Sequence, residues 1–326
     1  MNRTKSKPGI LAVFAATCLM GCAAASAQEK FPSRPVQIVV PTPPGGGTDV
    51  DFRLLAELAE PALGQKVIII NRGGGAGMVG VSSVVREKPD GYTLAGIWNS
   101  PLTMTPQIES APYKPNDYEA VLLINAAPTV LCTKSDFPAA TGQDLIATIK
   151  ANPGRYTYGT DGVGGFMQLA VERILSQVGA KARSVPFASA GETLLAMLGG
   201  HIDIYSGAVT IVEPYVKNGQ AKCLLLTSAK RVPSLPGAAS LTDVGLADAE
   251  TLVWHGLIGP NGIPADRLTT LQAAFDTAAH SERYVKYAES RGIEIDVRKS
   301  ADFRKLIDSE YSAMSGVINS VGLSKK

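Results

Sequence analysis

The chain has 326 residues, of which 45% are hydrophobic, with 31 basic and 29 acidic residues. This length can bury a large hydrophobic core and predicts two domains. The charges nearly balance and Lys and Arg form no cluster, so the sequence lacks the basic surface of a nucleic-acid-binding protein. No nucleic-acid partner is therefore expected.

The first 27 residues have the layout of a secretory signal peptide, in which basic residues precede an apolar run from Ile10 to Met20. That run is shorter than the roughly 20 residues that a membrane-spanning helix needs. We expect cleavage after Ala27; the alternative is lipidation of Cys22, because the residues before it resemble a lipobox. Removing the leader with its three basic residues leaves 28 basic and 29 acidic residues. Both interpretations place the protein outside the cytoplasm.

From Val36 onward, short β-branched runs alternate with longer amphipathic segments, which is typical of α/β proteins with helices covering parallel sheets. The expected strands cover residues 36–40, 67–70, 92–97, 120–124, 129–133, 156–158, 183–185, 202–205, 222–227 and 252–258. The expected helices cover residues 49–62, 79–87, 141–151, 166–178, 190–198, 265–280, 282–291 and 301–321.

The strands that contain Cys132 and Cys223 bracket a block of helices and strands that resembles the material on either side. A chain that leaves one lobe, builds a second and returns would have this order. We expect lobe 1 to comprise residues 28–124 and 228–326 and lobe 2 residues 125–227, with the ligand site in the cleft between them. In an oxidising compartment the two cysteines form either a disulfide or two buried thiols in neighbouring strands.

Three glycine-rich stretches follow strands and precede helices, at residues 43–49, 73–80 and 159–165. A helix N-terminus presents unpaired N–H groups, and glycine lets an anion approach them closely. The loops therefore predict carboxylate or phosphate binding; the alternative is tight turns that need positive φ. In the first loop, Thr48 is a candidate ligand contact and Asp49 a candidate N-cap.

The middle loop contains a G-x-G-x-x-G motif from Gly75 to Gly80, which is the strongest indication of an enzyme in the chain. A dinucleotide site needs an acidic residue about 20 residues later, at the end of the next strand. That strand ends in Trp98-Asn99-Ser100 instead, so a dehydrogenase is disfavoured and no cofactor is expected. The three histidines accompany no nucleophile motif or metal-binding cluster, so we expect neither catalysis nor a metal site. His255 is interpreted as a hydrogen-bonded structural histidine; the alternative is a ligand contact.

Motifs in a fixed order link these loops along nearly the whole mature chain. They are Pro35 to Asp49, Asn71-Arg72, Lys88 to Leu94, Ala151 to Gly154, Tyr158 to Thr160, Val185 to Phe187, Leu198 to Gly200, Leu226 to Arg231 and Gly256-Leu257. In this order they resemble the Bug or TctC-type receptors of tripartite tricarboxylate transporters.

The resemblance implies an α/β, type II-like periplasmic binding protein, in which each lobe is a mostly parallel sheet flanked by helices and crossover strands form the hinge. It also implies a monomer that binds a small carboxylate and docks on membrane permease subunits; a receptor for a periplasmic sensor domain is the alternative. The ligand-binding residues implied by position are Thr42, Gly45, Gly46, Gly47, Thr48, Asp49, Trp98, Asn99, Ser100, Thr160, Gly164, Gly165, Phe166 and Ser206.

The loop of the second lobe departs from the family pattern, in which Gly164 is usually followed by Ser or Thr and, three residues on, by His. Here Gly165, Phe166 and Met167 follow, so the expected hydroxyl donors are missing. With Trp98 beside the first-lobe contacts, the pocket is expected to prefer an aromatic or otherwise apolar monocarboxylate. The alternative is that Phe166 and Met167 pack on the helix face.

Overall fold

The computed structural model describes residues 1–2, 30–187 and 190–325. The predicted cleavage site at Ala27 and the candidate lipidation site at Cys22 lie outside the described residues. Within them, no helix is both long enough and apolar enough to cross a membrane.

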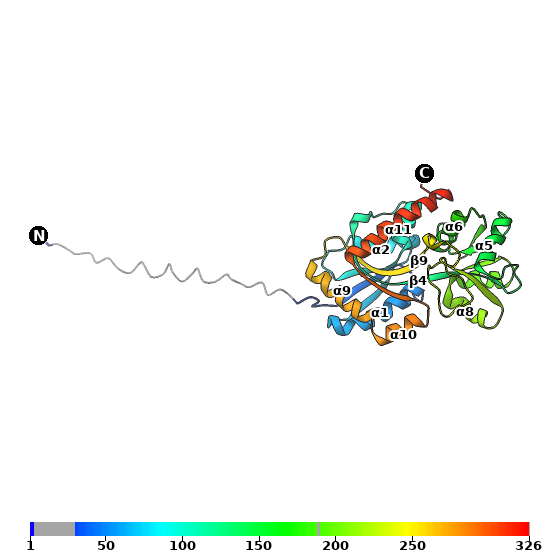
Figure 1. Ribbon diagram of the computed structural model, residues 1–326. Helices are drawn as coiled ribbons and strands as arrows, with labels where there is room; N and C mark the ends of the chain where they lie inside the picture. Colours follow the sequence, from blue (N-terminus) through cyan, green and yellow to red (C-terminus); the bar gives the residue numbers. More distant parts are fainter. Residues whose placement is uncertain (3–29, 188–189, 326) are drawn as a thin grey trace.

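Helices and strands alternate along the chain in the order expected of an α/β protein (Figure 1). The strands are β1 (Val36–Val40), β2 (Val67–Asn71), β3 (Thr93–Trp98), β4 (Tyr118–Lys134), β5 (Thr157–Thr160), β6 (Arg183–Pro186), β7 (Ile204–Ala208), β8 (Ala221–Leu226), β9 (Leu252–Pro260) and β10 (Glu294–Lys299). The helices are α1 (Gly47–Leu63), α2 (Met78–Val85), α3 (Ser100–Thr103), α4 (Thr105–Ile108), α5 (Gly142–Ala151), α6 (Phe166–Val178), α7 (Ala190–Leu198), α8 (Val209–Lys217), α9 (Ala265–Ala279), α10 (Glu282–Glu289) and α11 (Ser300–Ser320).

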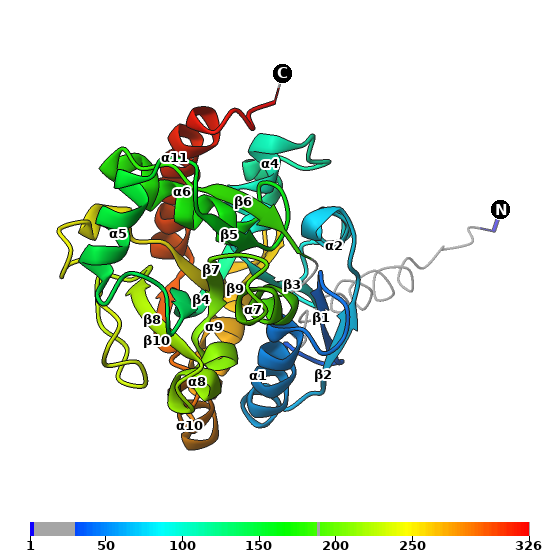
Figure 2. The ribbon, with the colours of Figure 1, turned by 90° about the vertical axis from the view of Figure 1, so that its right-hand side faces the viewer.

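The strands form two sheets that share β4. The first sheet has the order β2-β1-β3-β9-β4, with β10 also on β4, and uses residues 118–128 of β4. The second has the order β4-β7-β5-β6, with β8 also on β4, and uses residues 129–134. Figure 1 shows α1, α2, α9, α10 and α11 around the first sheet and α5, α6 and α8 around the second. Figure 2 is viewed from the side of the second sheet.

Strand direction differs between the outer and the shared parts of the sheets. The pairs β1–β2, β1–β3, β5–β6 and β5–β7 are parallel. The pairs that β4 and β9 form with their neighbours are antiparallel. The α/β class is therefore confirmed, and antiparallel pairing is concentrated where the chain passes between the sheets.

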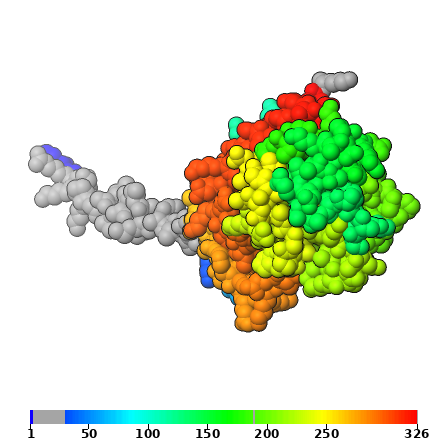
Figure 3. Space-filling view, turned by 45° about the vertical axis from the view of Figure 1, so that its right-hand side comes forward, coloured from blue at the N-terminus to red at the C-terminus, as the bar shows by residue number. Residues whose placement is uncertain are grey.

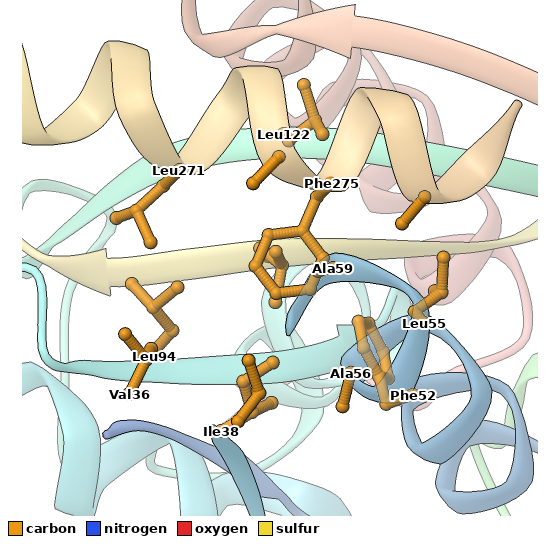
Figure 4. Close-up of a cluster of buried hydrophobic side chains, with 14 of the residues drawn as sticks. Val36, Ile38, Phe52, Leu55, Ala56, Ala59, Leu94, Leu122, Leu271 and Phe275 are labelled. Atoms are coloured by element: carbon orange, nitrogen blue, oxygen red, sulfur yellow. The ribbon is translucent and has the colours of Figure 1, made fainter. Parts of the chain in front are cut away.

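The main core lies between the first sheet and the helices α1 and α9. Apolar residues recur every three or four positions on α1, so one face of this helix is buried. Figure 4 shows Phe52 and Leu55 of α1 beside Phe275 of α9, above Ile38 and other residues of the sheet. This packing fixes the position of the α1 N-terminus relative to the ends of the strands.

Five elements differ from the sequence expectation, among them the short helices α3 and α4, which were not expected. The runs at 120–124 and 129–133 form one 17-residue strand, β4, because small residues and Pro128 interrupt the β-branched pattern without ending the pairing. Helix α8 was not expected, since Pro214 lies inside it. Strand β10 was not expected either, because its charged residues alternate with only two apolar ones, Ile295 and Val297.

Cys132 of β4 and Cys223 of β8 face each other in the antiparallel pair and form a disulfide, with their Cα atoms 4.0 Å apart. Of the two alternatives for these cysteines, the structure has the disulfide. It closes a long loop, with the two cysteines 91 residues apart in sequence, and such a cross-link typically adds about 2–4 kcal/mol of stability. The second sheet is therefore covalently held next to its junction with the first.

Candidate functional site

The loop between β1 and α1 presents the N-terminus of a 17-residue helix. Its N-cap, Gly46, is extended, with φ −70° and ψ 162°, and no side chain caps the helix. Gly45 has φ +85°, in the left-handed region that glycine adopts without strain. The first N–H groups of α1 are therefore left without a capping side chain, at the positive end of the helix dipole, and no side chain at residues 45–47 screens them.

Asp49 is not the N-cap that the sequence suggested, because the helix begins at Gly47 and places Asp49 in its first turn. One carboxylate oxygen accepts the Gly45 N–H at 2.8 Å and the Arg53 Nε at 3.0 Å, and the other accepts the Asn71 Nδ2 at 2.7 Å. Burial acts to raise the pKa of Asp49, but these hydrogen bonds together hold it below its usual value. Asp49 thus shapes the loop.

Thr48 begins a buried polar network beneath the loop. Its hydroxyl lies 3.2 Å from Nε2 of His255, whose Nδ1 lies 2.8 Å from Oδ2 of Asp51. The Asp51 carboxylate also accepts the Tyr284 hydroxyl and the Asn125 Nδ2, each at 2.8 Å. Because the Asp51 carboxylate only accepts, Nδ1 of His255 is the donor in that hydrogen bond, and Nε2 is the ring atom that bonds to the Thr48 hydroxyl. The interpretation of His255 as a hydrogen-bonded structural histidine is confirmed.

Trp98 ends β3, and Asn99 and Ser100 follow it at the same edge of the first sheet. Asn99 is fully buried, and its Nδ2 donates to the Leu252 carbonyl at 3.0 Å and to Glu310 Oε1 at 2.8 Å. Both amide hydrogens are used, and the side-chain oxygen, an acceptor, has no partner. Trp98 is partly exposed, and the Ser100 hydroxyl points to a methionine sulfur.

Glu310 of α11 holds the Asn99 amide in place. Its second oxygen accepts the Trp254 Nε1–H at 2.7 Å. Burial raises the pKa of Glu310 to about 6, although the hydrogen bonds from Asn99 and Trp254 act to lower it. Glu310 is therefore a positioning group for Asn99.

Thr160 and Ser206 lie on neighbouring strands of the second sheet. β5 and β7 run parallel, with Tyr158 opposite Ile204, so the same register places Thr160 beside Ser206 near the carboxyl ends of both strands. The Thr160 hydroxyl donates to the Gly162 carbonyl at 3.2 Å. Ser206 is 1% exposed, and its hydroxyl has no partner.

Gly164 and Gly165 form the start of α6, with Gly165 as its N-cap. Gly164 has φ +72°, and a Cβ added to it would lie 2.5 Å from the Cδ1 of Ile108 in α4. The loop of the second lobe therefore packs directly against a helix next to the first sheet. The carboxylate of Asp161 lies at this helix N-terminus, where its Oδ1 accepts the Met167 N–H at 3.0 Å.

Phe166 is 2% exposed and belongs to an apolar cluster that joins α6 to α11. Met104 and Met314 lie in the same cluster, and Met167 packs against it. This burial favours the packing interpretation of Phe166 and Met167. A ligand contact by Phe166 stays a prediction.

Three buried side-chain atoms without a hydrogen-bond partner stand out in the described part of the chain: Thr42 Oγ1, Asn99 Oδ1 and Ser206 Oγ. All three belong to residues that the sequence assigned to the ligand site. Extending the β1–β3 register places Thr42 beside Trp98, so two of the atoms lie where β1 and β3 end. An unpartnered buried polar group costs about 1–3 kcal/mol, and such groups at strand ends indicate a site that a ligand and its waters complete.

A cavity away from these atoms is a second candidate for the site. A cavity of about 560 Å³ lies where residues 228–234 approach β10, and no predicted site residue lines it. Figure 3 shows this face, where the yellow segment adjoins the orange one. Charged side chains of both signs line this cavity, including those of Lys230, Arg231 and Glu294. The buried polar atoms without a partner lie at the strand ends instead. We therefore place the candidate site at the strand ends.

The family model described as tripartite tricarboxylate transporter family receptor matches residues 51–323. The chain belongs to this family. The receptor is 30% identical to a UPF0065 protein of Bordetella pertussis, over 97% of this chain and 99% of that protein. The resemblance deduced from the motifs is thus confirmed.

Solved structures agree with this assignment. A TctC solute binding protein from Polaromonas matches the receptor with a TM-score of 0.78 and 26% identity, covering 89% of this chain and 99% of that one. Rpa4515 of R. palustris, solved with adipate, matches with a TM-score of 0.77 and 25% identity, covering 90% and 99%. The fold and the family are those of periplasmic solute-binding receptors.

The middle glycine loop of the receptor has a packing explanation. A Cβ on Gly80 would lie 2.5 Å from the Pro41 Cβ and 2.7 Å from the Arg72 carbonyl oxygen. Gly77 has φ +93° and lies against Trp98 and Pro101. These glycines allow a turn and a close approach of α2 to β1, which accounts for the motif without a dinucleotide.

Sequence reasoning missed three acidic residues that shape the site: Asp51, Asp161 and Glu310. Asp161 carried a signal, since an aspartate shortly before a helix is a common source of N-terminal capping. Asp51 and Glu310 carried none, because their partners are more than 50 residues away in the chain.

Proposed function

We propose that this receptor binds a small carboxylate between two lobes in the periplasm and delivers it to the permease subunits of a tripartite tricarboxylate transporter, without catalysing a reaction. In this proposal residues 1–27 are removed as a signal peptide. Lobe 1 comprises residues 28–124 and 228–326, and lobe 2 residues 125–227. The change of partners along β4 at residues 128–129 supports a hinge close to the first boundary.

The unpartnered atoms of Thr42, Asn99 and Ser206 carry the proposal, because they coincide with the positions implied by the family. The uncapped N-terminus of α1 lies beside Thr42, whose Oγ1 is 3.8 Å from where a Cβ of Gly46 would lie. Oriented N–H groups with a hydroxyl and bridging waters can bind a carboxylate without an arginine. The related Rpa4515, solved with adipate, supports this class of ligand.

Two measurements on the mature protein test the proposal. Native mass spectrometry should detect a small carboxylic acid that co-purifies, and calorimetric titration with a panel of aliphatic and aromatic acids should yield one-site binding for at least one of them. Binding should also raise the melting temperature, because the ligand stabilises only the folded state. If every acid leaves both the heat signal and the melting temperature unchanged, the carboxylate proposal is wrong.

A further inference from the structure

The N-terminus of α6 is occupied by a carboxylate of the chain itself. Oδ1 of Asp161 accepts the Met167 N–H at 3.0 Å, and the backbone N–H groups of Phe166 and Gln168 also bond to this carboxylate. These N–H groups belong to the first turn of the 13-residue helix, where a bound anion would otherwise sit. An aspartate therefore satisfies the helix end that a ligand carboxylate would need.

The absence of a side chain at residue 165 makes this arrangement possible. A Cβ added to Gly165 would lie 2.3 Å from Oδ1 and 2.7 Å from Cγ of Asp161, closer than such atoms can approach. Gly165 has φ −70° and ψ 165°, which any residue can adopt, so the backbone itself does not require glycine here. The Asp161 carboxylate can therefore occupy this position only because residue 165 has no Cβ.

Three further polar groups of this loop also have partners close by in the chain. The Gly164 N–H donates to Gln168 Oε1 at 2.7 Å, and the Gly165 N–H donates to the Gly162 carbonyl at 3.3 Å. The Thr160 hydroxyl donates to the same carbonyl. Among the described residues of the second sheet, the buried side-chain group without a partner is the uncharged Ser206 hydroxyl.

We propose that Asp161 determines specificity by closing the second-lobe anion site, so that the receptor selects monocarboxylates with an uncharged far end over dicarboxylates. This inference rests on the proposed function. The ligand carboxylate binds at α1, where the N–H groups have no side-chain cap. A second carboxylate at the far end would find these first-turn N–H donors already bonded to Asp161, and the ionised Asp161 carboxylate would repel it. Burial raises the pKa of Asp161, whereas the hydrogen bonds from the backbone N–H groups act to lower it.

The test uses pairs of acids that differ only in the second carboxylate: butyrate with succinate, hexanoate with adipate, and benzoate with terephthalate. Calorimetry on the mature protein should show at least one monocarboxylate binding at least about 30-fold more tightly than its partner. Asp161→Asn keeps the size of the side chain and its acceptor oxygen but removes the charge, so it should reduce this ratio at least about tenfold. Asp144→Asn, the same change in the first turn of α5, should leave the ratio unchanged.

A thermal-stability cycle tests the packing independently of any ligand. Gly165→Ser alone should lower the melting temperature, because its Cβ collides with the Asp161 carboxylate. In the Asp161→Ala background, Gly165→Ser should instead raise the melting temperature, because a serine at the N-cap can accept a free N–H of the first turn. Additive effects of the two changes would show that Asp161 does not fill the helix end, and the inference would fall.

The outcomes separate the two proposals. Binding of dicarboxylates as tight as that of their monocarboxylate partners, or a ratio unmoved by Asp161→Asn, overturns this inference and leaves the receptor function standing. Failure of all six acids and of the broader carboxylate panel overturns the proposed function and this inference with it.

Discussion

The helices α1 and α6 begin in nearly the same way and present opposite surfaces. Each has a glycine N-cap without a capping side chain, with φ −70° and ψ 162° at Gly46 and φ −70° and ψ 165° at Gly165. Each start is accompanied by an aspartate. The Asp49 carboxylate accepts hydrogen bonds from the Gly45 N–H and from Arg53, whereas the Asp161 carboxylate accepts them from the first N–H groups of α6.

The difference shows that a glycine-rich helix start is a potential anion site whose state depends on the nearest carboxylate. At α1 the aspartate lies inside the helix and pairs with Arg53 one turn later in the same helix, so the N–H groups at the helix end stay without a side-chain cap. At α6 the aspartate precedes the helix. It lies five residues before Phe166, the first residue whose N–H it accepts, and its carboxylate folds back over the helix end. Both loops are rich in glycine and carry an aspartate, and geometry decides which one can hold a ligand.

The largest expected effect comes from making the first helix start resemble the second. Gly46→Asp places a carboxylate beside the α1 N-terminus, and the backbone there accepts a side chain because a Cβ meets nothing closer than 3.6 Å. Repulsion of the ligand carboxylate should weaken binding at least about 100-fold in calorimetry. Gly237→Asp adds the same charge at an exposed, unobstructed glycine and should leave affinity unchanged. Unchanged affinity in folded Gly46→Asp would show that the first loop is not the anchor.

Removing the charge that shapes the first loop should have a smaller effect. Asp49→Asn should lower the free energy of unfolding by about 1–3 kcal/mol at pH 7 and weaken ligand binding about tenfold, because charged hydrogen bonds to Arg53 and Gly45 are lost. Since the folded pKa of Asp49 lies below the unfolded value near 3.8, its stabilisation is present above that value and is lost as pH falls through the folded pKa. In urea unfolding, the difference in free energy of unfolding between the variant and the wild type should therefore be present at pH 7 and smaller at pH 3.

Glu310 allows the anchoring of Asn99 to be tested through pH. Its folded pKa of about 6 is raised above 4.5, so the stability linked to its protonated form is present below 4.5 and is lost as pH rises through 6. The free energy of unfolding of Glu310→Gln relative to that of the wild type should therefore increase by up to about 2 kcal/mol between pH 4 and pH 8. Chemical unfolding at both pH values measures this, and a constant difference would contradict the shifted titration.

Substitution of Ser206 should have the smallest effect, and it should change stability and affinity differently. Ser206→Ala removes a buried hydroxyl that has no partner, so stability should stay the same or rise, while the affinity for the carboxylate falls about three- to tenfold. Ser240→Ala is the matched control, because that buried hydroxyl donates to Asp243 at 2.8 Å. It should lower the melting temperature without changing affinity. A loss of stability in Ser206→Ala would indicate a structural partner for its hydroxyl.

Much of the fold could be predicted because its signals are local. β1, α6 and α7 begin and end at the expected residues, since β-branched runs, amphipathic spacing and glycine ends are all encoded within a few residues. β10 and α8 could not be predicted, because an edge strand with alternating charges and a helix containing proline depend on the surfaces they contact.

For the candidate site, the sequence by itself determined the glycine loops at helix starts, the polar residues at strand ends and the family. Only the tertiary structure decided which of those groups are left without partners. The Thr48 hydroxyl is bound by a histidine 207 residues away, and Asn99 by a glutamate 211 residues away. The α6 start is closed by a carboxylate whose direction follows from packing. Hydrogen-bond satisfaction is a property of the folded surroundings, and no local pattern encodes it.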